Sequence, residues 1–174
     1  FYGLYAPLNE AYLRELGVDT ILGGEFETGL VSLAKRLNTI TNNRQAHFDV
    51  AQSEPQISLA RQTFQTPDRR DLPPLSKYAY LNFGDDQQRL TGYTEASRGC
   101  KHHCRHCPVV PVYNGRFRIV QPEVVLADIQ RQVGAGAKHI TFGDPDFLNG
   151  PGHTFRLIES LHQAWPDLTY DVTI

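Results

Sequence analysis

Strand-like and helix-like segments alternate through residues 91–174, and this alternation constrains the fold more than any other feature of the chain. Short segments with strand character are separated by longer ones in which hydrophobic residues recur at helical spacing: 91–97, 121–137, 138–145, 153–165 and 168–174. Such an order is typical of parallel strands joined by crossover helices. We therefore expect an α/β fold with ligands bound at the loops that follow the strands.

Both helical segments are amphipathic and have clear ends. Pro122 lies in the first turn of one helix, and Pro166 stops the other. We expect these side chains to face inward: Val125, Ile129 and Val133 in the first helix, and Phe155, Ile158, Leu161 and Trp165 in the second. Within 109–120, the pair Asn114 and Gly115 predicts a hairpin or a tight bend between two apolar runs.

The N-terminal part predicts a second α/β unit. Strand and helix patterns alternate over 1–6, 8–17, 18–24 and 25–38, and in the first helix Leu8, Tyr12 and Leu16 recur at four-residue spacing before Gly17. Residues 38–90 are rich in proline and lack a sustained period, which predicts a linker with one or two short strands. The expected parts are therefore the end of one domain (1–37), a linker (38–90) and a second domain (91–174).

Composition narrows the partners and the compartment. The 17 Lys and Arg residues nearly balance the 19 Asp and Glu residues, giving a net charge of -2, so we expect no nucleic acid partner. No apolar run is long enough to cross a membrane, and we expect a cytoplasmic protein without membrane contact. The chain contains no Met and both its ends are apolar, so we expect it to be an internal fragment of a longer protein.

All three cysteines lie within residues 100–107, spaced CxxxCxxC and interleaved with histidines. Close spacing and an odd number favour metal binding in a reducing compartment over a disulfide framework. Three thiolates suit zinc or an iron-sulfur cluster, but they leave a tetrahedral site one ligand short.

Two alternatives supply that ligand differently. In a structural Cys3His zinc site, His102, His103 or His106 would be the fourth ligand, although such sites usually pair two knuckles about a dozen residues or more apart. A cluster used only for electron transfer usually has four protein ligands, which disfavours that class of protein.

The loop resembles the signature of the radical SAM superfamily, CxxxCxΦC with Φ commonly aromatic; here it reads Cys100-Lys-His-His-Cys104-Arg-His106-Cys107. The resemblance implies a partial (β/α) barrel whose first half is 91–174, and a 4Fe-4S cluster held by the three cysteines. It also implies that S-adenosylmethionine binds the fourth iron, with His106 near its adenine. Reductive cleavage by an external electron donor such as flavodoxin or ferredoxin would then give a 5'-deoxyadenosyl radical that acts on a substrate.

A second motif of that superfamily, often written GGE, ends the second barrel strand and receives the amino group of S-adenosylmethionine. The matching position here reads GDPD and consists of Gly143, Asp144, Pro145 and Asp146. The resemblance implies that these residues bind the co-substrate, and an ordinary Asp-Pro turn is the alternative.

Residues 16–37 resemble the closing unit of the cobalamin-binding domain that precedes the barrel in one branch of the superfamily. A GExE-like turn after the last strand reads Gly24-Glu25-Phe26-Glu27 here. The resemblance implies that 1–37 end a Rossmann-like domain and makes cobalamin a candidate cofactor. The DxHxxG loop of that branch is not in this chain, and a Rossmann-like tail without cofactor is the alternative. Methyl transfer, ring formation, methylthiolation and oxidation all remain open.

Overall fold

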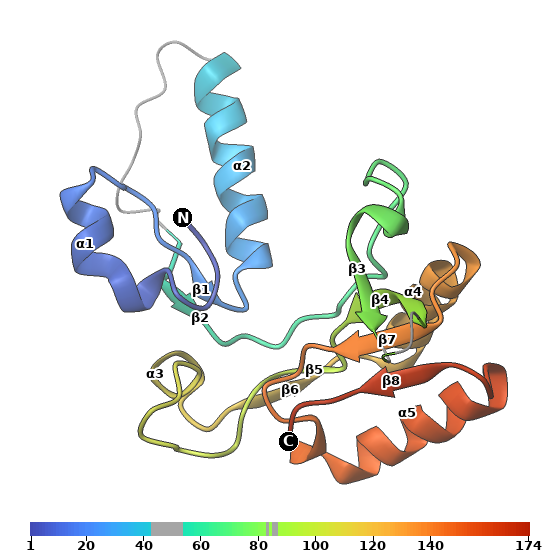
Figure 1. Cartoon of the computed structure of the whole chain (residues 1–174). Coiled ribbons are helices and arrows are strands. Elements are labelled where there is room, and N and C mark those ends of the chain that lie inside the picture. Colours follow the sequence, from blue (N-terminus) through green and yellow to red (C-terminus); the bar gives the residue numbers. More distant parts are fainter. Residues whose placement is uncertain (43–53, 83, 85–86) are drawn as a thin grey trace. The chain divides into compact units, whose positions relative to one another are not determined.

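The computed structural model describes residues 1–42, 54–82, 84 and 87–174, and the rest of the predicted linker lies outside them (Figure 1). The chain forms two compact units. One consists of residues 1–62 and 102–116, and the other of residues 63–101 and 117–174. Both contain helices and strands, so the predicted α/β class is confirmed at that level.

The second unit is built on a four-stranded sheet with the order β3-β4-β7-β8. Its strands are β3 (Ala79–Asn82), β4 (Gln88–Thr94), β7 (His139–Phe142) and β8 (Thr169–Asp171). β4, β7 and β8 are parallel, as predicted, and β3 is antiparallel to β4. The short 3-10 helix η3 (Leu75–Lys77) leads into β3, inside the region predicted as linker.

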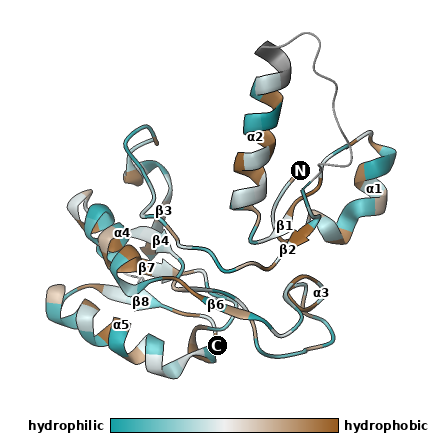
Figure 2. Ribbon diagram, turned by 180° about the vertical axis from the view of Figure 1, so that it is seen from behind, coloured by the Kyte–Doolittle hydropathy of each residue, from teal (hydrophilic) through white to brown (hydrophobic). Residues whose placement is uncertain are grey.

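Two crossover helices connect the parallel strands and cover one face of the sheet. α4 (Pro122–Gly134) precedes β7, and α5 (Pro151–Ala164) lies between β7 and β8. Figure 2 shows hydrophilic and hydrophobic residues alternating along both helices, as expected for helices buried on one side. Their apolar sides form the core with the strands: Val125, Ile129, Ile140, Phe142, Leu157 and Leu161.

One predicted inward residue of α5 is wrong. Phe155 is 60% exposed, whereas His153, Thr154, Leu157 and Leu161 are buried. The fully buried stripe is 154, 157 and 161, and the predicted Ile158 and Trp165 pack against the same core as partly buried side chains.

A small antiparallel ribbon follows β4 and holds the start of the cysteine loop. β5 (Ser97–Gly99) pairs with β6 (Phe117–Ile119). The turn at Asn114 and Gly115 forms as a tight bend, with φ of 45° and 74°. The predicted apolar run before this turn is not a strand, because residues Val110–Tyr113 form the short helix α3 instead.

The first unit contains η1 (Pro7–Asn9), α1 (Glu10–Glu15), α2 (Glu27–Asn42), α3 and a two-stranded parallel sheet of β1 (Gly23–Gly24) and β2 (Ile57–Ser58). Residue 2 forms an isolated parallel bridge with residue 22. The predicted row of Leu8, Tyr12 and Leu16 is exposed, and of these residues only Tyr12 lies within α1. Leu13 of α1 is buried with Ala6 and Ile21. No helix in the described part of the chain is long and apolar enough to span a membrane.

Candidate functional site

The parallel strands of the second unit bring the start of the cysteine loop and the GDPD turn to one edge of the sheet. β4 and β7 run parallel with Thr94 opposite Phe142, so the segments that follow them start side by side. The cysteine loop begins after β5, and the GDPD turn begins directly after β7. This edge is where α/β folds usually bind ligands.

Cys100 is held in the interior of this edge by a side chain that the sequence did not indicate. The Asn149 Nδ2 group donates a hydrogen bond to Cys100 Sγ over 3.3 Å, and Asn149 Oδ1 accepts one from the Lys101 backbone N–H over 2.8 Å. Asn149 and Cys100 are both buried. Asn149 is the last residue of the 3-10 helix η4 (Phe147–Asn149), which follows the GDPD turn.

Cys104 and Cys107 belong to the first unit and lie on one turn. The Cys107 N–H donates to the Cys104 carbonyl over 3.2 Å. Cys104 is exposed, Cys107 is half-buried, and all three cysteines are free of disulfides. In the described residues no group of three or more His, Cys, Asp or Glu side chains is gathered around a common metal position.

The neighbouring histidines are exposed, including His106 at the Φ position. His103 lies over the backbone of Gly115, where a Cβ atom would collide with the imidazole ring. Gly115 has a φ of 74°, so the backbone of the turn favours glycine there.

Asp144 points into the protein. It is 2% exposed and its carboxylate accepts hydrogen bonds from the Ala96 N–H over 3.0 Å and from the Ser97 hydroxyl. Burial raises the pKa of Asp144 above its ordinary value, against the effect of these two donors. Asp144 therefore ties the end of β7 to the start of β5.

The remaining residues of the turn lie nearer the surface. Pro145 is exposed and Gly143 is half-buried. Asp146 is half-buried, and its side chain accepts a hydrogen bond from the Leu148 N–H over 3.0 Å, which caps η4. A Cβ atom on Gly143 would collide with the Tyr93 hydroxyl.

The sheet face that α4 and α5 leave uncovered carries polar side chains. Strand register places Thr91, His139 and Thr169 in one row, and Tyr93, Thr141 and Asp171 in the next. Asp171 Oδ1 accepts hydrogen bonds of 2.7 Å from Thr141 and from His139 Nε2, while His139 Nδ1 lies 2.8 Å from Thr169 Oγ1. Burial opposes the charge of Asp171, but the hydrogen bonds from Thr141 and His139 together hold its pKa below the ordinary value.

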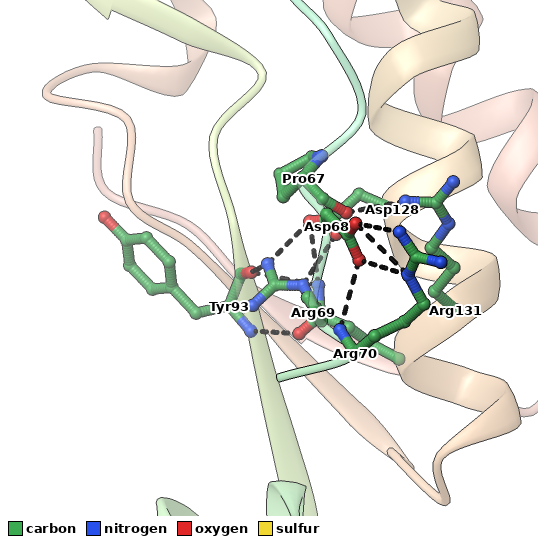
Figure 3. Close-up of polar contacts among 8 residues, drawn as sticks. Pro67, Asp68, Arg69, Arg70, Tyr93, Asp128 and Arg131 are labelled. Atoms are coloured by element: carbon green, nitrogen blue, oxygen red, sulfur yellow. Dashed lines mark hydrogen bonds and ion pairs between the residues drawn. The ribbon is translucent and has the colours of Figure 1, made fainter. Parts of the chain in front are cut away.

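A second polar cluster fixes the segment before β3 against β4 and α4 (Figure 3). Arg69 forms two hydrogen bonds with the Asp128 carboxylate, of 2.7 and 2.9 Å, and donates a third to the Tyr93 carbonyl over 3.1 Å. Gln132 also donates to that carbonyl, over 3.0 Å. Beside the cluster lies a pocket of about 210 Å³, whose lining includes Phe64 and Glu95.

In the first unit, residues of the predicted GExE-like turn make contacts within that unit. Gly24 has a φ of 68°, and a Cβ atom there would collide with the Ser58 carbonyl of β2. Glu25 is fully buried, and its Oε1 accepts a hydrogen bond from the Tyr113 hydroxyl over 3.2 Å. Glu27 opens α2, and its Oε2 accepts a hydrogen bond from Gln62 Nε2 over 3.2 Å.

No protein-family model matches the chain, and no solved structure matches it. It is 40% identical over 53 residues to the tRNA-2-methylthio-N(6)-dimethylallyladenosine synthase of Desulfitobacterium hafniense strain Y51, covering 30% of this chain and 12% of that enzyme. It is 25% identical over 99 residues to the hopanoid C-2 methylase of Rhodopseudomonas palustris strain TIE-1, covering 56% of this chain and 19% of that enzyme. The chain thus spans less than a fifth of either relative. Both similarities support the resemblance described above at the level of the superfamily.

The polar face and Asn149 were not predicted from the sequence. The strands HITF and TYD alternate polar and apolar residues, which indicates one uncovered polar face. Asn149 had no comparable signal, because an Asn before Gly-Pro is a common turn residue.

Proposed function

We propose that the chain carries the cluster-binding part of a radical SAM enzyme, with Cys100, Cys104 and Cys107 as ligands of a 4Fe-4S cluster. The observation that carries the proposal is the position of the CxxxCxxC loop after β4 and β5, at the head of a parallel unit in which β4, α4, β7, α5 and β8 follow in order. The two distant enzyme relatives support the same superfamily.

The donor set fits such a cluster. All three thiols are outside disulfides, and they are soft ligands of the kind that iron-sulfur clusters require. His103 stacks on Gly115, a position that serves the turn rather than a metal. The spacing favours a three-thiolate cluster over a Cys3His zinc site, because structural zinc sites usually pair two ligand knuckles about a dozen residues or more apart.

When bound, the cluster supplies one electron that reductively breaks the C5'–S bond of S-adenosylmethionine, leaving methionine and a 5'-deoxyadenosyl radical. The protein's own residues bind, orient and shield these groups. We assign the co-substrate's amino group to the turn of Gly143, Pro145 and Asp146, with Asp144 holding that turn against Ala96 and Ser97. His106 is the adenine neighbour in this proposal, and a flavodoxin or ferredoxin is the electron donor.

We assign substrate binding to the face of the sheet that α4 and α5 leave uncovered. Its hydrogen-bonded set of His139, Thr141 and Asp171 presents an ionised carboxylate, and the Asp171 side chain is 58% exposed. This favours a substrate with hydrogen-bond donors. The relatives' names specify a modified tRNA nucleoside and a hopanoid, so neither defines the substrate of this chain.

Cobalamin binding by the first unit stays a prediction. Glu25 and Gly24 serve the interior of that unit through Tyr113 and Ser58, which accounts for the turn without a cofactor. A titration of the full chain with hydroxocobalamin, followed by its visible absorption, tests this part of the proposal.

The decisive experiment is anaerobic reconstitution of the full chain with iron and sulfide. We expect about four iron and four sulfide per chain, and an electron paramagnetic resonance (EPR) signal of the reduced cluster that changes when S-adenosylmethionine is added. Cys100→Ala, Cys104→Ala and Cys107→Ala should each abolish the cluster. His102→Ala and His103→Ala are the matched controls and should retain it.

Stoichiometric zinc would overturn the proposal, in particular if it is lost on replacing one of those histidines. Such a result would establish the Cys3His module instead.

A further inference from the structure

We propose that Asn149 is a positioning residue for the cluster, and that its Nδ2–H···Sγ hydrogen bond to Cys100 makes the cluster easier to reduce. This inference rests on the proposed function, because it assigns a role to a residue next to one of the three cluster ligands. Asn149 lies outside both the cysteine motif and the GDPD turn.

The orientation of the Asn149 amide is fixed by its neighbours. Its Oδ1 accepts the Lys101 N–H over 2.8 Å, and its Nδ2 group donates to Cys100 Sγ and to the Asp146 carbonyl, each over 3.3 Å. Rotating the amide by half a turn would place an NH2 group against the Lys101 N–H and a carbonyl against the Asp146 carbonyl. The hydrogen-bond network therefore selects the orientation in which the sulfur receives a donor.

The surroundings of this hydrogen bond make it strong and rigid. Asn149 is 6% exposed and Cys100 is 9% exposed, so little water competes for the sulfur. Lys101 Nζ donates to the Asn149 carbonyl over 2.5 Å and lies 5.2 Å above the Phe117 ring. A Cβ atom on Gly150 would lie 2.9 Å from that ring, so the residue after Asn149 is packed tightly as well.

A donor at a thiolate ligand affects the two oxidation states unequally. Reduction adds one electron to the cluster, and the extra negative charge is partly carried by the cysteine sulfurs. An N–H group directed at the sulfur therefore stabilises the reduced form more than the oxidised form, which raises the reduction potential. The Lys101 ammonium group nearby acts in the same direction.

Two substitutions separate donating from positioning. Asn149→Leu has a similar size and removes both the donor and the acceptor. Asn149→Asp keeps an oxygen for the Lys101 N–H, removes the donor and adds a negative charge. We expect the cluster to form in both variants, with a reduction potential more negative than in the unmodified protein and lowest in Asn149→Asp.

Thr154→Val is the matched control. The Thr154 hydroxyl donates to the Phe147 carbonyl over 2.7 Å, so this change disturbs the same 3-10 helix without touching Cys100. Its potential should stay at the unmodified value. Potentials are measured by redox titration of the reconstituted full chain, with the reduced cluster quantified by EPR.

A further measurement tests the hydrogen bond in the protein without a substitution. In protein labelled with ¹⁵N-asparagine, pulsed EPR of the reduced cluster should show a ¹⁵N coupling, and Asn149→Asp, where it forms the cluster, should lack it. The role of Asn149 is overturned if both Asn149 variants have the same reduction potential as Thr154→Val and the unmodified protein. It is also overturned if the labelled protein shows no ¹⁵N coupling. Either result leaves the proposed function intact. A chain that takes up no cluster overturns the proposed function itself, and the inference with it.

Discussion

Arg69 and Asp128 are 59 residues apart in sequence and form a bidentate ion pair. Arg69 Nε lies 2.7 Å from Asp128 Oδ1, and Arg69 Nη2 lies 2.9 Å from Asp128 Oδ2. The Asp128 side chain is 2% exposed. A carboxylate buried this deeply needs its partner, because water cannot replace the lost hydrogen bonds. The pair therefore fastens the segment before β3 to helix α4.

Arg69→Met keeps an apolar stem but leaves the Asp128 charge without its partner. We expect the free energy of unfolding to fall by about 2 kcal/mol, less than for a fully buried pair, because 32% of the Arg69 side chain reaches solvent. Urea unfolding followed by the fluorescence of Trp165, which packs against the core of the same unit, measures the change.

Arg70→Met is the control for this prediction. Arg70 pairs with Asp68 on the surface, with side chains 86% and 59% exposed, and such pairs contribute little. Equal losses in the two variants would contradict the assigned role of Arg69.

Asp144→Asn should change how stability depends on pH. Burial raises the pKa of Asp144 in the folded protein, so the folded state binds a proton more readily than the unfolded state. Its contribution to stability is therefore complete below the ordinary pKa of 3.8 and is lost as the pH rises through the higher folded value. The unfolding free energy of the unmodified protein, relative to Asp144→Asn, should decline over that interval. Parallel curves for the two proteins would refute the prediction.

Thr141→Val should raise the pKa of Asp171 towards its ordinary value, because one of the two donors at Oδ1 is removed. In the unmodified protein, the lowered pKa of Asp171 stabilises the fold at pH values above the pKa of this group in the unfolded state. This stabilisation is lost as the pH falls through the pKa of the folded state. NMR titration of the Asp171 carboxyl carbon follows the change. Thr91→Val on the same face serves as control, because the Thr91 hydroxyl donates to the Arg89 carbonyl and should leave Asp171 unaffected.

Gly143→Ala should displace the Tyr93 ring, because the new Cβ atom occupies the space of the Tyr93 hydroxyl. Burial and the Glu95 carboxylate raise the pKa of Tyr93 to about 12. Moving the ring into solvent and breaking its 3.3 Å hydrogen bond to Glu95 should return the pKa towards 10.0. Ultraviolet titration measures tyrosinate formation, with Tyr93→Phe identifying the signal.

Gly152→Ala is the matched change in the helix that follows, where a Cβ atom meets no neighbour. A pKa of Tyr93 that is the same in Gly143→Ala and Gly152→Ala would count against the close contact between Gly143 and Tyr93.

The sequence predicted those helices and strands that are marked by a regular spacing of apolar residues within one segment. The helices expected within 121–137 and 25–38 form as Pro122–Gly134 and Glu27–Asn42, and the expected parallel strands form around His139 and Thr169. Local patterns could not decide that Phe155 faces solvent, because that depends on where α5 crosses the sheet. The apolar run before Asn114 fits either a hairpin or a tight bend, and Val110–Tyr113 forms a helical turn after the cysteine loop.

In the candidate site, too, some features could be predicted from the sequence and others could not. The cysteine spacing and the strand-end position of GDPD are visible in one stretch of sequence each. The hydrogen bonds from Ser97 to Asp144, from His139 to Asp171 and from Asn149 to Cys100 join residues 32 to 49 positions apart. Such pairings follow from sheet register and loop packing, which a pattern in one segment does not contain.

The hydrogen bond from the Lys101 backbone to Asn149 Oδ1 also has a kinetic consequence. The partner of this amide belongs to a different loop, so solvent reaches the N–H only when the two loops separate. The exchange of this one proton with deuterium therefore reports how often the edge of the sheet opens, independently of global unfolding. The exchange rate of the Lys101 N–H thus measures the local opening of the segment that starts the cysteine loop.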